Sequence, residues 1–138
     1  MPVRRLLALL VFLGLSLTSL AAPVSFLDSG EMLKNRQYGF EPASRAEVDA
    51  VRKRLPASFS VSPFLEDEDL DWYRHRGDLV LDRPLSNGHA LIVEGNLRIR
   101  GSYDDYRNNT GLLVVLGDMQ VENVVSWGSL AVAGKLQA

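Results

Sequence analysis

Three nine-residue stretches decide the fold: LIVEGNLRI at residues 91–99, LVVLGDMQV at 113–121 and LAVAGKLQA at 130–138. When they are aligned on their central glycines, every position two or four residues from the glycine is apolar, while the positions between them vary. Alternation with a period of two is typical of a β-strand, because successive side chains of a strand point to opposite faces. Each stretch is therefore expected to be extended chain that buries one face.

Recurrence of this pattern along the chain predicts a solenoid. The central glycines, together with Gly77, recur every 17–22 residues, which is typical of proteins built from stacked coils. A glycine inside a strand weakens it, so glycines that recur in register indicate the corner of each coil. Before Gly77 the pattern breaks down, because Tyr73 and His75 occupy the matching positions. We expect a mainly β fold, a parallel β-helix of about four coils over residues 73–138, with the even positions inside.

The sequence of residues 22–72 predicts a short α-helical or irregular segment that flanks the solenoid. Ser44 and Glu47 form a capping box, the following apolar residues have helical spacing, and Pro56 ends the run. This pattern predicts an amphipathic helix over about residues 45–54. A weaker start signal near Asp28 suggests a second short helix.

The outward positions ahead of the corner glycines are unusually apolar. They are Ile92, Val114, Leu116, Ala131 and Ala133. One outer face of the solenoid is therefore expected to be covered. The cover is either part of the same chain, namely the helix near residues 45–54 or the segment around Phe59 and Phe64, or a second copy of the chain.

The N-terminus has the form of an export signal. Arg4 and Arg5 precede an apolar run that is too short to span a bilayer of ~30 Å comfortably, and small residues stand before Ala22. We expect residues 1–21 to be a signal peptide, cleaved before Ala22. The mature protein is then exported, periplasmic or extracellular, and has no membrane span.

Composition excludes several classes of function. The 138 residues include 15 Lys and Arg, 17 Asp and Glu, two His and no Cys, with a net charge of −2. That balance gives no broad basic surface for nucleic acid. The lack of cysteine excludes disulfides, thiolate zinc sites and a cysteine nucleophile. No catalytic residue, metal ligand or cofactor is expected.

A polar insertion between the second and third coils is the best candidate for ligand binding. Residues 102–109 carry two tyrosines and two aspartates, which would project from one corner, and a tryptophan lies between the third and fourth strands. Such side chains could stack on and hydrogen-bond a sugar, for instance of a cell-envelope polysaccharide; alternatively, the rings cover the edge of the core. The candidate residues are Tyr103, Asp104, Asp105, Tyr106 and Trp127. A polysaccharide lyase or hydrolase is a weaker alternative, because adjacent aspartates in extended chain point to opposite sides.

The Gly-x-Leu-x-Val-x-Gly texture over about residues 77–138 resembles the polymer-forming, bactofilin-type β-helices. This resemblance implies small coils that stack end to end into filaments. Two features of the sequence depart from that family: the export signal and the insertion at residues 102–109.

The last coil would leave Leu130, Val132 and Leu136 at an open end, which invites pairing of strand edges. Either further coils follow in the natural protein, or the end docks on another subunit as a homo-oligomer. These features predict an exported, non-enzymatic β-helix protein that is a structural or self-associating scaffold of the cell envelope. The alternative is a carbohydrate-binding module.

Overall fold

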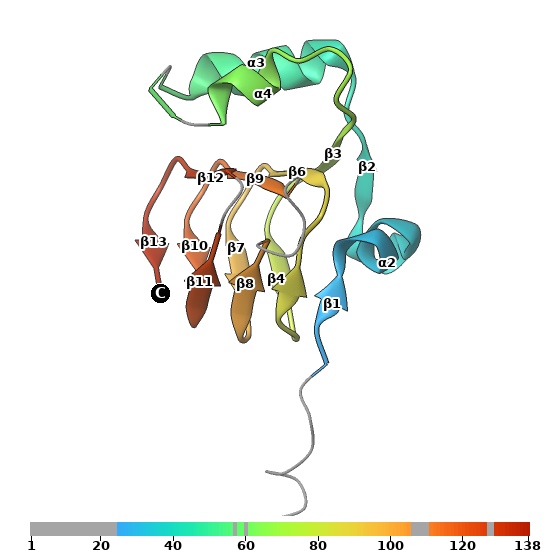
Figure 1. The fold of residues 1–138 in the computed structure, drawn as a ribbon, viewed down its shortest axis with the longest axis vertical. Coiled ribbons are helices and arrows are strands. Elements are labelled where there is room, and N and C mark those ends of the chain that lie inside the picture. The colour runs from blue at the N-terminus through green and yellow to red at the C-terminus, as the bar shows by residue number, and fades with distance from the viewer. Residues whose placement is uncertain (1–24, 57, 60, 106–110, 127–128) are drawn as a thin grey trace, which may run out of the picture.

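The chain winds into a parallel β-solenoid (Figure 1). The computed structural model describes residues 25–56, 58–59, 61–105, 111–126 and 129–138, so the predicted signal peptide lies outside the described residues. The first coil comprises β3 (Trp72–His75), β4 (Leu79–Leu81) and β5 (Leu85–Ser86). The second comprises β6 (Ala90–Val93), β7 (Leu97–Ile99) and β8 (Ser102–Asp104), and the third β9 (Leu112–Val115), β10 (Met119–Gln120) and β11 (Asn123–Val125). The predicted parallel β-helix is confirmed, with three complete coils and a fourth that contributes β12 (Ser129–Val132) and β13 (Leu136–Gln137).

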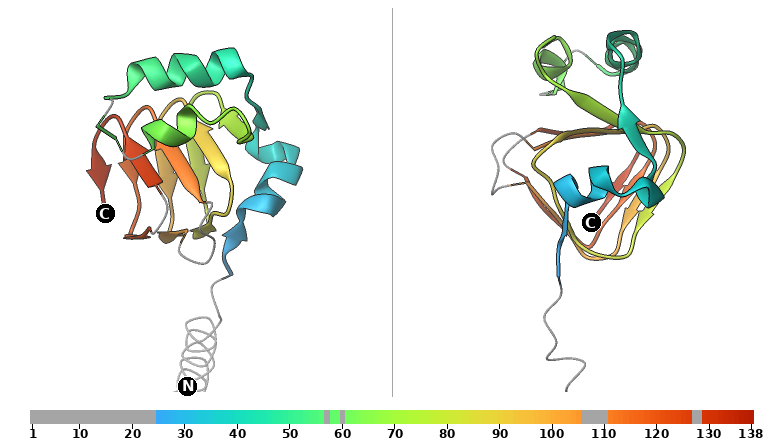
Figure 2. Two further views of the ribbon diagram at one scale, coloured as in Figure 1. Left: turned by 45° about the horizontal axis from the view of Figure 1, so that its top comes forward. Right: turned by 90° about the vertical axis from the view of Figure 1, so that its right-hand side faces the viewer.

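Each coil contributes its strands to three sheets, which form the sides of a three-sided tube (Figure 2). The sheet orders are β1-β5-β8-β11, β4-β7-β10-β13 and β2-β3-β6-β9-β12. Register is constant from coil to coil, so that Leu91 lies beside Leu113 and Leu113 beside Leu130. Like side chains therefore stack in columns along the tube.

The predicted inward positions form the interior of the tube, as the alternation requires. The residues two and four positions from Gly95 and Gly117 are all buried in one core cluster: Leu91, Val93, Leu97, Ile99, Leu113, Val115, Met119 and Val121. Full burial of such a side chain stabilises the fold by about 1.5–3 kcal/mol.

The corner glycines are required by the close approach of successive coils. The amides of Gly95, Gly117 and Gly134 each donate a hydrogen bond of 3.0 Å to the carbonyl of the corner glycine one coil earlier. A β-carbon on Gly117 would lie 2.7 Å from the Gly95 carbonyl oxygen, which is closer than any real contact. The sequence spacing of the glycines varies because the connections elsewhere in the coil differ in length.

The start of the tube is closed by a cap, which we call the N-terminal cap: β1 (Leu27–Asp28), α2 (Ser29–Lys34), the 3-10 helix η1 (Arg36–Tyr38) and β2 (Phe40–Pro42). Strand β1 pairs in parallel with β5, β2 pairs antiparallel with β3, and α2 runs across the mouth of the tube (Figure 2). The helix expected near Asp28 is thus α2. Its Met32 is fully buried in the same core cluster as the coils.

Two helices cover the outside of the β6-β9-β12 side (Figure 1). They are α3 (Arg45–Arg54), which has the predicted bounds and is capped by the Ser44 hydroxyl accepting from the Glu47 amide, and α4 (Ser62–Leu65). Their apolar side chains form a second core with the outward residues of the sheet, namely Val48, Val51, Leu55, Val61, Leu65, Ile92, Val114, Leu116 and Ala131. The prediction that the chain's own helix covers this face is confirmed.

One ion-pair bridge ties the covering helix to the sheet. Arg74 of β3 reaches Glu47 of α3 at 2.7 Å and Glu94 at 3.1 Å, and its side chain is only 11% exposed. None of the described helices has the length and apolar character that crossing a membrane requires.

Replacing Val115 with Asp should unfold the coil stack, because a carboxylate would be buried without a partner. We expect a loss of about 3–5 kcal/mol in the free energy of unfolding. The matched change, Gln120→Asp, places the same charge on the exposed side of the next strand and should be nearly neutral. Thermal unfolding followed by circular dichroism compares the two. Equal melting temperatures would contradict the assignment of inside and outside.

Candidate functional site

Three of the predicted sugar-binding residues do not project into solvent, and that expectation is wrong for them. Ser102–Asp104 form β8, a regular strand paired with β5 and β11, and not part of a loop. Tyr103 is fully buried in the core, and Asp104 and Asp105 are buried as well. Tyr106 and Trp127 lie outside the described residues. Tyr103 instead follows the alternative interpretation, in which the ring packs against the core.

Tyr103 belongs to a buried polar network that links the coils. Its hydroxyl accepts a hydrogen bond from Asn87 Nδ2 at 3.1 Å and donates to Asp105 Oδ2 at 3.3 Å. The same Asp105 oxygen accepts from the Ser126 hydroxyl at 2.7 Å. Asn87 also donates to the carbonyl oxygen of Leu112. Burial raises the pKa of the Tyr103 hydroxyl, so it stays protonated and acts as a donor.

Both histidines hold the N-terminal cap on the first coil. His75 contacts the carbonyl oxygens of Tyr38 and Asp78 through its two ring nitrogens, at 2.7 and 2.9 Å. His89 Nδ1 lies 2.7 Å from the hydroxyl of Ser29, which also accepts from the Gly88 amide. Within the described residues no His, Cys, Asp and Glu side chains cluster as metal ligands.

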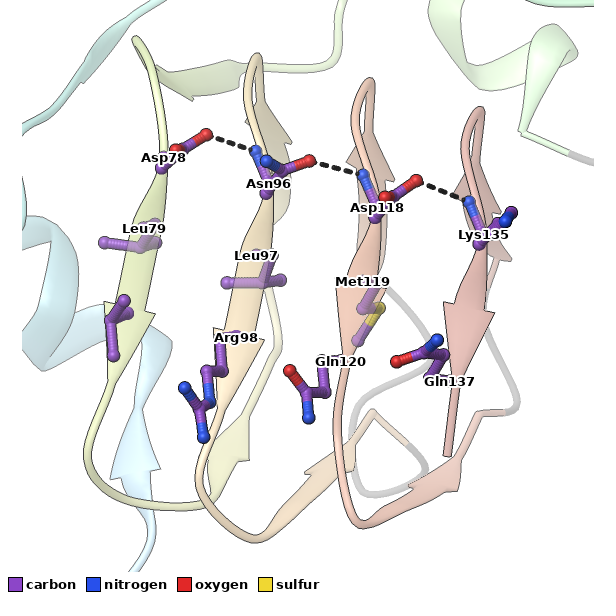
Figure 3. A pocket seen from close by; sticks show the side chains of 11 residues that line it. Asp78, Leu79, Asn96, Leu97, Arg98, Asp118, Met119, Gln120, Lys135 and Gln137 are labelled. Carbon is purple, nitrogen blue, oxygen red and sulfur yellow. Dashed lines mark hydrogen bonds between the residues drawn. The ribbon is translucent and has the colours of Figure 1, made fainter.

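A ladder of polar side chains follows the corner glycines along the outside of the β4-β7-β10-β13 sheet (Figure 3). Asp78 Oδ1 accepts from the amide of Asn96, Asn96 Oδ1 from Asp118, and Asp118 Oδ1 from Lys135, each at 2.8 Å. Each side chain thus satisfies the amide of the next coil. Lys135 ends the ladder, because an ammonium group offers no acceptor.

A shallow hollow of about 310 Å³ lies beside this ladder (Figure 3). Its outward side chains stand in one row across the strands, with Arg98 next to Gln120 and Gln120 next to Gln137. These groups donate hydrogen bonds, but the row holds no pair of carboxyl groups and no nucleophile with an adjacent base.

The fourth coil presents apolar side chains at a surface that we call the C-terminal edge: the outer edges of β12 and β13. Both strands lie at the end of their sheets in the described structure. Leu136 is 47% exposed, although its counterparts Leu97 and Met119 are almost fully buried, and Leu130 and Val132 are only partly buried. These three leucine and valine side chains line a groove of about 420 Å³ with Phe59.

Sequence reasoning missed both the ladder and the buried network. The ladder has a sequence signal, since Asp78, Asn96 and Asp118 each follow a corner glycine. The network has no such signal in a single sequence. Asn87 and Asp105 both hydrogen-bond to the Tyr103 hydroxyl, but they lie in connecting segments that only the folded coils bring together.

Fold and surface together define the class: a parallel β-solenoid protein with an N-terminal cap and a two-helix cover. The chain is similar to the uncharacterized protein YdbD of Escherichia coli (strain K12), with 28% identity over 99 residues. The match covers 72% of this chain but only 13% of the relative, so the chain spans a small part of that protein's length. No protein-family model matches the chain, and no solved structure matches it.

Removing the Tyr103 hydroxyl should destabilise the protein without removing any exposed group. In Tyr103→Phe, Asn87 and Asp105 each lose a partner inside the protein, which costs about 1–3 kcal/mol. Tyr73→Phe is the control, because the Tyr73 ring packs on the same core and its hydroxyl makes no hydrogen bond to another described residue. Chemical denaturation measures both free energies of unfolding. If the two variants were equally stable, the network would have no structural role.

Proposed function

We propose that this protein is an exported, non-enzymatic β-solenoid that acts as a structural scaffold of the cell envelope and associates through its C-terminal edge. The observation that carries this proposal is the difference between the two ends of the tube. Met32 and Leu81 are fully buried at the capped end, whereas Leu136 is half exposed at the other. Exposed aliphatic side chains beside strand edges favour pairing with another chain.

The use of the polar side chains supports a structural role. Asp78, Asn96 and Asp118 bind backbone amides, and Tyr103 and Asp105 satisfy each other in the interior. These polar side chains therefore hydrogen-bond within the protein and hold the coils together, instead of being available to a ligand. Export of this scaffold rests on the signal-like residues 1–21.

Carbohydrate binding is the second candidate, and one hollow favours it at a new position. Phe26, 41% exposed, lines a hollow of about 440 Å³ with Asp82, Arg100, Ser102 and Glu122. An aromatic face beside carboxylates and a guanidinium suits stacking on a sugar ring and hydrogen bonding to its hydroxyls. This function would use the corner between the β4-β7-β10-β13 and β1-β5-β8-β11 sheets.

Cell fractionation with chemical crosslinking tests the proposed function. We expect a protein that begins at Ala22 by mass spectrometry, absent from the cytoplasm and crosslinked into assemblies with more than one copy. A protein that retains residues 1–21 in the cytoplasm would contradict export, and an exported protein never crosslinked to itself would contradict the scaffold. A processed monomer that sediments with purified peptidoglycan would favour the second candidate.

A further inference from the structure

We propose that His75 is a pH-sensitive latch of the N-terminal cap. Its imidazole holds the segment from η1 to β2 on the first coil while both ring nitrogens carry a proton, and releases this segment when one proton is lost. Release frees the edge of β3, which β2 otherwise covers, so that another strand can pair there. The inference concerns regulation at the capped end of the tube and goes beyond the proposed function.

His75 lies between two backbone carbonyl groups, which can only accept hydrogen bonds. Nδ1 is 2.7 Å from the carbonyl oxygen of Tyr38 in the cap, and Nε2 is 2.9 Å from the carbonyl oxygen of Asp78 in the first coil. A neutral imidazole has one N–H donor, and its other nitrogen is an acceptor. It can therefore donate to one of these oxygens only, while its second nitrogen faces the other oxygen with a lone pair. Both hydrogen bonds form together only in the imidazolium.

The contact with Asp78 replaces a hydrogen bond that later coils make through the backbone. The carbonyls of Asn96, Asp118 and Lys135, at the matching positions, each accept from an amide of the coil before. Strand β4 is the last of its sheet in the described structure, so the carbonyl of Asp78 has no such amide beside it and receives His75 Nε2 instead. His75 thus joins the cap to the point where the regular hydrogen bonding of the coils begins.

The segment from η1 to β2 is packed closely against the imidazole. Gly39, between η1 and β2, has a φ of 68°, and a β-carbon there would lie 3.3 Å from His75 Nδ1. Phe40 is the partner of His75 in the β2–β3 pair, and the centroids of the two rings are 5.6 Å apart. His75 is only partly buried, so its ring can exchange protons with solvent. A change in its charge therefore acts directly on this segment.

The sign of the pH effect follows from the two acceptors. Imidazole ordinarily changes charge between about pH 5 and 8, where carboxylates, phenols and guanidinium groups ordinarily keep one charge state. Groups of these three other kinds are the remaining ionisable side chains on the strand of His75 and on the elements packed against it: Arg36, Tyr38, Glu41, Tyr73, Arg74, Arg76, Asp78 and Glu94. Because the closed latch binds the second imidazole proton, the closed cap must become less stable as the pH rises.

His89, the second histidine at the cap, makes a contact that does not depend on its charge. Its Nδ1 lies 2.7 Å from the hydroxyl of Ser29, which also accepts from the Gly88 amide. A hydroxyl can donate to a neutral ring nitrogen or accept from a protonated one. This contact can form in either charge state, so the pH response of the cap is assigned to His75.

NMR of the nitrogen-labelled protein tests the latch. At about pH 5 we expect two imidazole N–H signals from His75. Amide exchange, corrected for its intrinsic dependence on pH, then follows the segment through Gly39 and Ala43, whose amides donate to the carbonyls of Arg36 and Trp72. Their protection should fall about tenfold or more between about pH 5 and pH 8, because a hydrogen bond from a charged donor is lost. Protection of the corner glycines should not change.

His75→Gln and His89→Gln are the matched variants. Glutamine at position 75 offers a donor that does not titrate, so the pH dependence of protection should disappear in His75→Gln and persist in His89→Gln. Three results would overturn the inference: equal protection of the wild-type segment at both pH values, a single imidazole N–H signal from His75 in acid, or a pH dependence that His75→Gln retains. The imidazole signals of the wild-type protein decide the question even where a variant does not fold.

Discussion

The structure depends on one repeated backbone contact, in which the amide of each corner glycine donates to the carbonyl of the corner glycine one coil earlier. This contact leaves no room for a β-carbon, as the distances at Gly117 show. It fixes the register of every coil, and the register in turn stacks the aliphatic columns inside and the Asp78–Asn96–Asp118 ladder outside. Connections of different length are tolerated because they leave the corners unchanged.

A stack built from such contacts has two ends, and in the described structure the two ends differ in how well they are covered. The N-terminal cap inserts Met32 into the column of aliphatic side chains and uses Ser29, His89 and His75 to hold itself in place. At the C-terminal edge the same column stays half exposed at Leu136. The bactofilin-type resemblance implied stacking end to end, but β2 and α2 occupy the positions that an incoming coil would need. Assembly through the free edge follows from this difference as our proposal.

The period-two pattern and the recurring glycines were sufficient to predict the solenoid and its inside. The bounds of α3 were predictable from the capping box at Ser44 and Glu47 and from Pro56, because these signals are local. Prediction failed where the contact was between coils. The sequence around Tyr103 and Asp105 was interpreted as an exposed polar loop, yet β8 is a regular strand, and Asn87 from the previous coil donates a hydrogen bond to the Tyr103 hydroxyl. A polar residue at an inward position is identified only when its partner one coil away is known.

Amide hydrogen exchange measured by NMR tests whether one continuous stack is closed at its N-terminal end. We expect slow exchange at the amides of Gly95, Gly117 and Gly134. Exchange should be equally slow at Leu27, whose amide lies within the cap and donates to the Pro84 carbonyl at 2.7 Å. Protected corner glycines with rapid exchange at Leu27 would show a cap that detaches. That result would contradict the closed end on which the account depends.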